Sequence, residues 1–309
     1  MIQVLDSART ELYAGRKLEG LNESQRDIFN NINKSASKHK DINLLLDINK
    51  NANSLDRLVQ ILNNDLDRLI RALEIYLTEF VEKLEITSKN PDIMKLSIDH
   101  VLSFNYSDTY ERNYGAKKDI EYDYIHGKAT ITNTVETCNM VLGIDEYLDD
   151  VKKNTELEFL PFKKIYQRIY KSTGKHYLDW IDKIKYDYVD YIIKQQHNLH
   201  NRTNSSTDSQ HCDYYLKRTI FKNSYAPKHN LYIFGHSLDV TDKDILKLFI
   251  CNDNVQTKIY YYRENDHDKK ILGKLIKNLI VIMGQDELIR RTSGAFKTIE
   301  FIPQTLPSN

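Results

Sequence analysis

The sequence predicts an α/β protein with a parallel sheet, a long helical region at its N-terminus and a helical insertion within the sheet domain. In the last third of the chain, segments of strand length alternate with segments of helical periodicity, which is typical of βαβ units. Upstream, apolar residues recur every three or four positions from Ser54 to Leu84, as in one long amphipathic helix. Together these patterns predict the α/β class.

The elements follow in order along the chain. Residues 1–96 form the predicted helical region, with polar short helices and loops to about residue 50 and then the long helix, for which Ser54 is a candidate N-cap. Residues 97–309 form the predicted α/β domain, and its insertion covers about residues 155–228, with a helix break at Gly174 and a polar loop over residues 201–210. Strands are expected near 98–104, 122–125, 140–142, 231–234, 258–262 and 298–302, and further helices over 108–114, 242–251 (with Thr241 as N-cap) and 268–283.

Composition limits the classes of function. Forty-four basic and forty-four acidic residues cancel, so bulk charge favours neither nucleic acid nor a membrane surface as a partner. Twenty-one tyrosines are better explained by packing than by stacking on bases. The three cysteines are far apart and predict neither disulfides nor a zinc site. No apolar run has the length of a membrane span or a signal peptide, so we expect a cytoplasmic protein.

Polar side chains follow three of the predicted strands. The first strand ends in Ser-Phe-Asn105-Tyr, the second in Tyr-Ile-His126-Gly127, and a later one in Phe-Gly235-His236-Ser237-Leu-Asp239. Parallel strands place their carboxyl ends at one rim of a sheet, where α/β proteins bind ligands. We therefore expect one pocket at this rim.

Each residue of the expected pocket has a chemical and a structural interpretation. The Asn105 amide could hold a water or a ribose hydroxyl, or only shape a turn. His126 could accept a proton while Gly127 allows close approach, or His126 could be a hydrogen-bonded histidine at a strand end. Gly235 and Ser237, before a helix start, suit a phosphate or ribose. Asp239 and Asp242 could bind ribose hydroxyls or act as caps.

These motifs, with Met140-Val-Leu-Gly143 between them, resemble the AbiH bacteriophage abortive-infection family, which is itself similar to sirtuin-like NAD-binding domains of Rossmann type. The resemblance covers roughly Ser97 to the C-terminus. It implies that Asn105 and His126 are catalytic and that NAD, as substrate or ligand, is held by Gly127, Gly235, His236, Ser237 and Asp239, with no metal. The Gly-rich strand and turn that open such domains have no counterpart here, because no Gly-x-Gly occurs. We expect either that this unit lies upstream of Met1 or that it has been lost.

The resemblance implies an anti-phage effector that binds NAD and hydrolyses it, acting as an NAD glycohydrolase. The alternative is a non-catalytic module in which the same pocket senses a nucleotide or a phage protein. A second alternative is a fragment whose helices pack against another chain. The expected partners are NAD or a related nucleotide, a phage-encoded trigger and a second copy of the chain.

Overall fold

The computed structural model describes residues 53–86, 88–115, 119–144, 157, 159–202, 229–265, 269–294 and 297–305. The chain divides into two compact units. The first comprises Met1–Val81 and Ala129–Ser172, and the second comprises Glu82–Lys128 and Thr173–Asn309. The short helices expected before residue 51 and most of the polar loop expected at 201–210 lie outside the described residues. Among the described residues, no helix combines the length and the apolar character that crossing a membrane requires.

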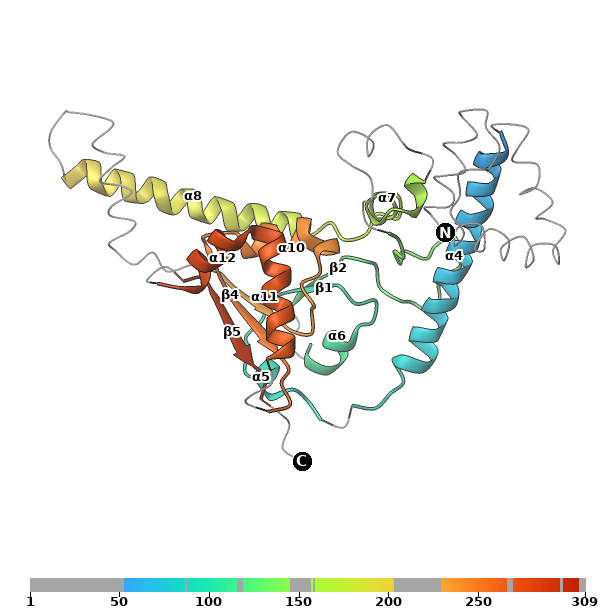
Figure 1. Cartoon of the computed structure of the whole chain (residues 1–309), viewed down its shortest axis with the longest axis horizontal. Helices are drawn as coiled ribbons and strands as arrows, with labels where there is room; N and C mark the ends of the chain where they lie inside the picture. The colour runs from blue at the N-terminus through green and yellow to red at the C-terminus, as the bar shows by residue number, and fades with distance from the viewer. Residues whose placement is uncertain are drawn as a thin grey trace, which may run out of the picture. The chain divides into compact units, whose positions relative to one another are not determined.

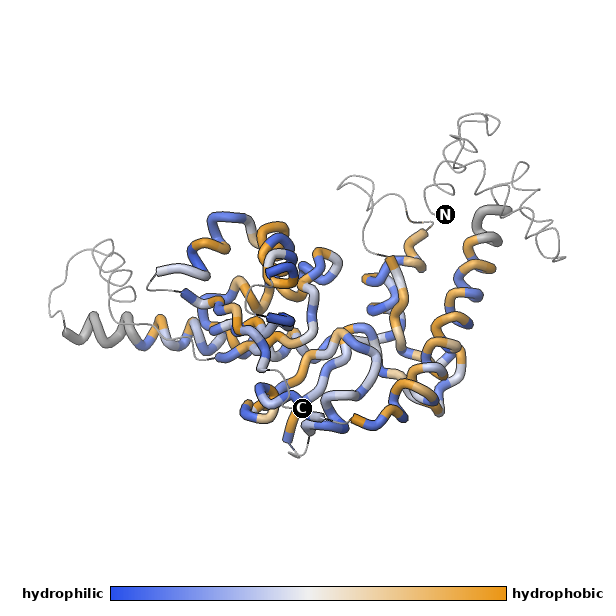
Figure 2. Tube along the Cα trace, turned by 60° about the horizontal axis from the view of Figure 1, so that its bottom comes forward, coloured by the Kyte–Doolittle hydropathy of each residue, from blue (hydrophilic) through white to orange (hydrophobic). Residues whose placement is uncertain are grey.

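The long helix of the first unit is confirmed. It is α4 (Asn53–Tyr76), which continues as a π-helical turn, η2 (Leu77–Val81), so it begins one residue before the predicted cap. Hydrophobic and hydrophilic residues alternate along α4 in Figure 2, as expected for a helix that packs on one side. The unit also contains a 3-10 turn, η4 (Leu160–Phe162), and α7 (Lys164–Tyr170).

A buried carboxylate joins α4 to the loop that follows residue 128. Glu74 is fully buried and accepts hydrogen bonds from Arg71 Nη1 (2.6 Å), the Thr130 amide (2.9 Å) and Asn133 Nδ2 (2.6 Å). Burial acts to raise the pKa of Glu74, but the hydrogen bonds from Cys138, Arg71 and Asn133 outweigh it, so the pKa lies below its ordinary value. Glu74 therefore stays charged and holds the loop on α4.

The strand predicted at residues 140–142 is wrong. The Leu142 amide donates to Gln167 Oε1 at 3.0 Å, and Gln167 Nε2 donates back to the Leu142 carbonyl at 3.3 Å. The buried side chain of Gln167 thus satisfies the backbone groups that a neighbouring strand would pair. In the described residues next to this segment, the pairing is an isolated parallel bridge between Ile144 and Lys163.

The second unit contains the parallel strands and confirms the α/β class (Figure 1). β1 (His100–Ser103) pairs with β2 (Glu121–Tyr124) in a two-stranded sheet. β3 (His229–Ile233), β4 (Val255–Tyr261) and β5 (Ile299–Pro303) form a three-stranded sheet in the order β3–β4–β5. Every pairing is parallel, but the strands form two small sheets where one continuous sheet was expected.

The helices of the second unit are α5 (Pro91–Met94), α6 (Thr109–Tyr114), α8 (Tyr177–Arg202), α10 (Lys243–Ile250), α11 (Lys270–Met283) and α12 (Gln285–Thr292), with a 3-10 turn η5 (Val240–Asp242) before α10. The sequence patterns did not indicate α12, which Gly284 at φ +86° separates from α11. The prediction of Thr241 as N-cap is wrong. Thr241 lies inside η5, and Asp239 Oδ1 accepts from its amide at 3.1 Å.

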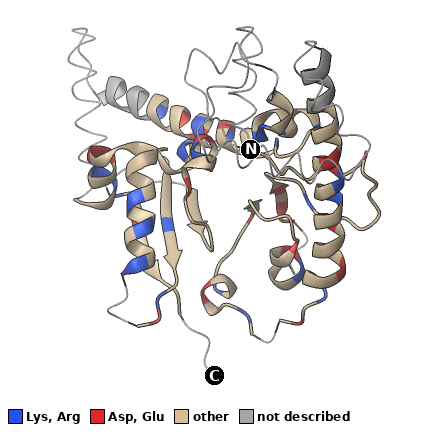
Figure 3. Cartoon of the chain, turned by 45° about the vertical axis from the view of Figure 1, so that its right-hand side comes forward, with Lys and Arg blue, Asp and Glu red and all other residues tan. Residues whose placement is uncertain are grey.

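Two apolar clusters hold the second unit together. One gathers residues of β3, β4, β5, α10, α11 and α12, and the other joins α8 and α10 to residues of β1, β3 and β4 and to Ile125. On α11, Leu275 and Leu279 are buried, whereas Lys270, Lys274 and Lys277 lie on its exposed side (Figure 3). Because buried apolar residues and exposed lysines occupy different sides of α11, its helical periodicity is visible in the sequence.

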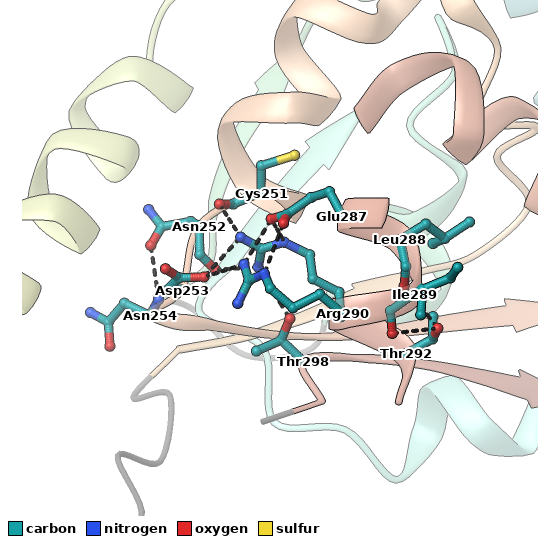
Figure 4. Close-up of polar contacts among 11 residues, drawn as sticks. Cys251, Asn252, Asp253, Asn254, Glu287, Leu288, Ile289, Arg290, Thr292 and Thr298 are labelled. Carbon is teal, nitrogen blue, oxygen red and sulfur yellow. Dashed lines mark hydrogen bonds and ion pairs between the residues drawn. The ribbon is translucent and has the colours of Figure 1, made fainter. Parts of the chain in front are cut away.

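A buried arginine anchors α12 to the sheet. The Arg291 side chain is 2% exposed and contacts Glu287 Oε1 (2.6 Å), Asp253 Oδ1 (2.8 Å), Thr298 Oγ1 (3.1 Å) and the Cys251 carbonyl (2.5 Å). These partners converge from α12, the turn after α10 and the residue immediately before β5 (Figure 4). These hydrogen bonds and ion pairs compensate the Arg291 guanidinium for the hydration that it loses on burial.

Candidate functional site

The first two sequence motifs leave the sheet at the same rim. β1 and β2 are parallel, Ser103 is in register with Tyr124, and the Ile125 amide donates to the Ser103 carbonyl at 2.9 Å. The chain beyond β1, starting with Phe104, and the chain beyond β2, leading to His126, therefore emerge side by side.

Two glycines set the position of His126. The Gly127 amide donates to the Tyr124 carbonyl at 3.0 Å, and Gly127 has φ +82°, which closes a tight turn around His126. Gly174 packs against the backbone of Ile125, and a β-carbon on Gly174 would lie 2.8 Å from the Ile125 carbonyl oxygen. His126 is consequently held in a buried position, at 7% exposure.

The third motif forms a strained turn after β3. Gly235 has φ +65°, and Leu238, which is fully buried, has φ +54° although it is not a glycine. Asn278 Nδ2 on α11 donates to the Ser237 carbonyl at 2.9 Å and fixes the turn from outside. The buried Leu238 side chain and this hydrogen bond oppose the backbone strain, which is of order 1–3 kcal/mol at such a residue.

The two motif histidines meet at one carboxylate. His126 Nε2 lies 3.4 Å from Asp242 Oδ1, and His236 Nε2 lies 3.6 Å from Asp242 Oδ2. All three side chains are nearly buried, at 9%, 13% and 12% exposure for His126, His236 and Asp242 respectively. We call these three residues the His-Asp-His cluster.

The two histidines differ in what their second nitrogen does. The Leu238 amide donates to His236 Nδ1 at 2.9 Å, so Nδ1 is an acceptor and the ring proton of neutral His236 is assigned to Nε2, facing Asp242. His126 Nδ1 is buried and has no hydrogen-bond partner among the described residues. Among the described residues, the second ring nitrogen is therefore hydrogen-bonded in His236 and unpaired in His126.

Aromatic rings form one wall of the cluster. The Phe104 ring makes an edge contact with His236, with centroids 4.4 Å apart, and lies 6.0 Å from His126. The Tyr106 ring lies 6.3 Å from His126, and burial together with the negative charge of Asp242 raises the pKa of the Tyr106 hydroxyl. Phe104 and Tyr106 belong to the first motif, but the sequence offered no reason to assign them to the site.

The remaining predicted residues surround this cluster in different ways. Asn105 is exposed and, with Gly235 and His236, lines a cavity of about 570 Å³. Ser237 is also exposed, and Asp239 acts as the N-cap of η5. The structure thus brings His126, His236 and Asp242 together, while ligand contacts by Asn105, Gly127, Gly235, Ser237 and Asp239 stay predictions. In the part of the chain that the structure describes, no group of His, Cys, Asp and Glu side chains has metal-site geometry.

Fold and site together define an α/β protein with a buried His-Asp-His cluster at the carboxyl rim of parallel strands. The sequence matches the family described as bacteriophage abortive infection AbiH over residues 25–262, which is more than half of the chain. The protein belongs to this family. The match begins upstream of Ser97, where the recognised motifs start. Searches of curated proteins and of solved structures gave no match.

Proposed function

We propose that the protein acts in bacteriophage defence by binding NAD as a substrate and hydrolysing its nicotinamide–ribose bond. Membership of the AbiH family supports a role in bacteriophage abortive infection. The proposal of NAD hydrolysis rests on the surroundings of His126. Its Nε2 faces the Asp242 carboxylate, and its buried Nδ1 has no hydrogen-bond partner among the described residues. A histidine backed by a carboxylate is a typical general base.

The proposed step moves one proton to His126. A water oxygen bonds to ribose C1′ as the bond from C1′ to nicotinamide breaks, and the electron pair leaves with neutral nicotinamide. The proton of the attacking water passes to His126 Nδ1, and the Asp242 carboxylate, 3.4 Å from Nε2, stabilises the imidazolium that forms. No group other than water is consumed, and the other product is ADP-ribose.

The surrounding residues supply binding in this proposal. Asn105 would orient the water or a ribose hydroxyl through its amide. Gly235 is open, since no atom lies within 4 Å of where its β-carbon would be, so a ligand could approach its backbone. Ser237 would contribute one neutral hydrogen bond, worth about 0.5–1.5 kcal/mol.

The test is nicotinamide release from NAD by the purified chain, followed by chromatography. His126→Ala should lower turnover by about 10²–10⁴-fold, the usual contribution of a general base. Asn105→Ala should lower turnover more than NAD affinity. The matched control is His176→Ala, because His176 is an exposed histidine immediately before α8 and is not a member of the His-Asp-His cluster.

The alternative of a non-catalytic sensing module predicts a different pattern. The wild-type chain would then bind NAD in calorimetry and release no nicotinamide, and His126→Ala would change affinity alone. If cells that express the chain resist phage with an unchanged NAD pool, and His126→Ala and Asn105→Ala resist equally well, hydrolysis is the wrong activity.

A further inference from the structure

The carboxylate of the His-Asp-His cluster has a different histidine beside each of its oxygens. Asp242 Oδ1 lies 3.4 Å from His126 Nε2, and Asp242 Oδ2 lies 3.6 Å from His236 Nε2. Because both rings are nearly buried, the charge on this carboxylate favours an added proton on either of them. Which histidine takes the proton therefore depends on the surroundings of the second nitrogen of each ring.

The backbone occupies the second nitrogen of His236. The Leu238 amide donates a hydrogen bond to His236 Nδ1 at 2.9 Å. An imidazole gains its second proton on the nitrogen that was an acceptor, so a charged His236 would carry an N–H at Nδ1. That N–H would point at the N–H of Leu238, and two donors would face each other where a hydrogen bond had been. The turn after β3 therefore favours the neutral form of His236.

This turn is fixed to α11 in two ways, so the Leu238 amide is held against the ring. Leu238 is fully buried in the apolar cluster that also contains Leu275 and Leu279 of α11. Asn278 Nδ2 on the same helix donates to the Ser237 carbonyl at 2.9 Å. Leu238 keeps its φ of +54° under these two restraints, although it is not a glycine.

His126 has the opposite surroundings. Its Nδ1 is buried and has no hydrogen-bond partner among the described residues, so a proton added there meets no opposing donor from them. Tyr106 is a further titratable group that faces this site, since its ring lies 6.3 Å from the His126 ring. Burial, and then the negative charge of Asp242, raise the pKa of the Tyr106 hydroxyl. Tyr106 is therefore neutral at neutral pH and brings no charge to the cluster.

We propose that His236 is a positioning residue, held neutral by the Leu238 amide, and that it directs the proton of the reaction to His126. Neutral His236 turns its Nε2–H toward Oδ2 of Asp242 and so orients the carboxylate. Because it gains no charge, it does not compete with the imidazolium of His126 for Asp242. The proton of the attacking water goes to His126 Nδ1, and none moves to His236. The part in turnover rests on the proposed NAD hydrolysis, whereas the order of protonation does not.

Nitrogen NMR of the full chain, labelled with nitrogen-15 in its histidines, tests the order of protonation without any substrate. On titration from about pH 8 to 5, His126 should gain a proton on Nδ1 at a higher pH than His236 does. Neutral His236 should carry its proton on Nε2. The variants His126→Ala and His236→Asn, which each lack one set of signals, assign the two rings among the ten histidines. Earlier protonation of His236, a proton on Nδ1 of neutral His236, or a His126 that stays neutral throughout would overturn the proposal.

His236→Asn tests the part in turnover. The asparagine Oδ1 can accept from the Leu238 amide in place of Nδ1, but the side chain is too short to reach Asp242. The kcat for nicotinamide release should fall about 10- to 100-fold, as for other partners that orient a reacting group, with KM unchanged. A raised KM with unchanged kcat would show that His236 binds NAD instead, and two unchanged constants would show no role; either result would overturn the proposal.

The matched control is His229→Asn. His229 also faces a carboxylate, Asp187 at 3.0 Å, but it lies at the amino end of β3, the opposite end from the turn that carries His236. This variant should leave kcat, KM and the His126 signals unchanged. A wild-type chain that releases no nicotinamide refutes the proposed hydrolysis, and the NMR titration then decides the assignment of His236 by itself.

Discussion

Replacing Gly174 by alanine should destabilise the second unit more than replacing Gly235, although both glycines have almost the same backbone conformation. Their φ angles are +64° and +65°. A left-handed conformation costs an alanine about 1–2 kcal/mol. Around Gly235 there is open space, so Gly235→Ala should lower the free energy of unfolding by about that amount alone.

Gly174→Ala adds a steric clash. Its β-carbon would lie 2.8 Å from the carbonyl oxygen and 2.9 Å from the Cα of Ile125, both of which are backbone atoms that cannot rotate away. Overpacking of this kind costs about 1–3 kcal/mol, so the total loss for Gly174→Ala is about 2–5 kcal/mol. Because Ile125 precedes His126, the same displacement should also disturb the His-Asp-His cluster.

Urea unfolding followed by tryptophan fluorescence measures both losses. Trp180 is the only tryptophan, lies in the second unit at 9% exposure, and donates to Glu121 at 2.9 Å, so its emission reports on this unit. The quantity of interest is the difference between the two variants, since the conformational penalty cancels. Equal losses for Gly174→Ala and Gly235→Ala would refute the argument that close approach to Ile125 is why residue 174 is a glycine.

Two further predictions concern the anchor of α12. Arg291→Met should lower the free energy of unfolding by about 2–3 kcal/mol. This is less than the ~3–5 kcal/mol typical of breaking a fully buried ion pair, because Asp253 and Glu287 are partly exposed. A loss under about 0.5 kcal/mol in urea unfolding would contradict this prediction. Hydrogen bonds from Arg290 and Arg291 lower the pKa of Glu287 to about 2, although burial of the carboxylate acts to raise this pKa. The folded-state pKa lies below the ordinary 4.5, so this stabilisation is complete above pH 4.5 and is lost as pH falls toward 2. Glu287→Gln should remove that part of the acid dependence, and identical acid-unfolding curves for the two proteins would show that Glu287 does not contribute.

Local pattern in the sequence was enough to predict much of this protein. The apolar period of α4 and the alternation of strands and helices after residue 229 depend on neighbours a few positions apart, so the α/β class could be predicted. The three strand-end motifs were recognisable for the same reason, and they identified the AbiH family that the family match confirms. The composition also shows that the chain has no formal net charge at pH 7.

Tertiary structure alone decided which of these residues meet. His126 and His236 stand more than a hundred positions apart in the sequence, and only the packing of the two sheets under α8 brings both to Asp242. The pairing of Leu142 with the Gln167 side chain, which replaced a predicted strand, is another contact between distant residues. The division of the strands into two sheets likewise depends on edge partners that parallel strands reach only through long crossovers, and no local sequence pattern encodes them.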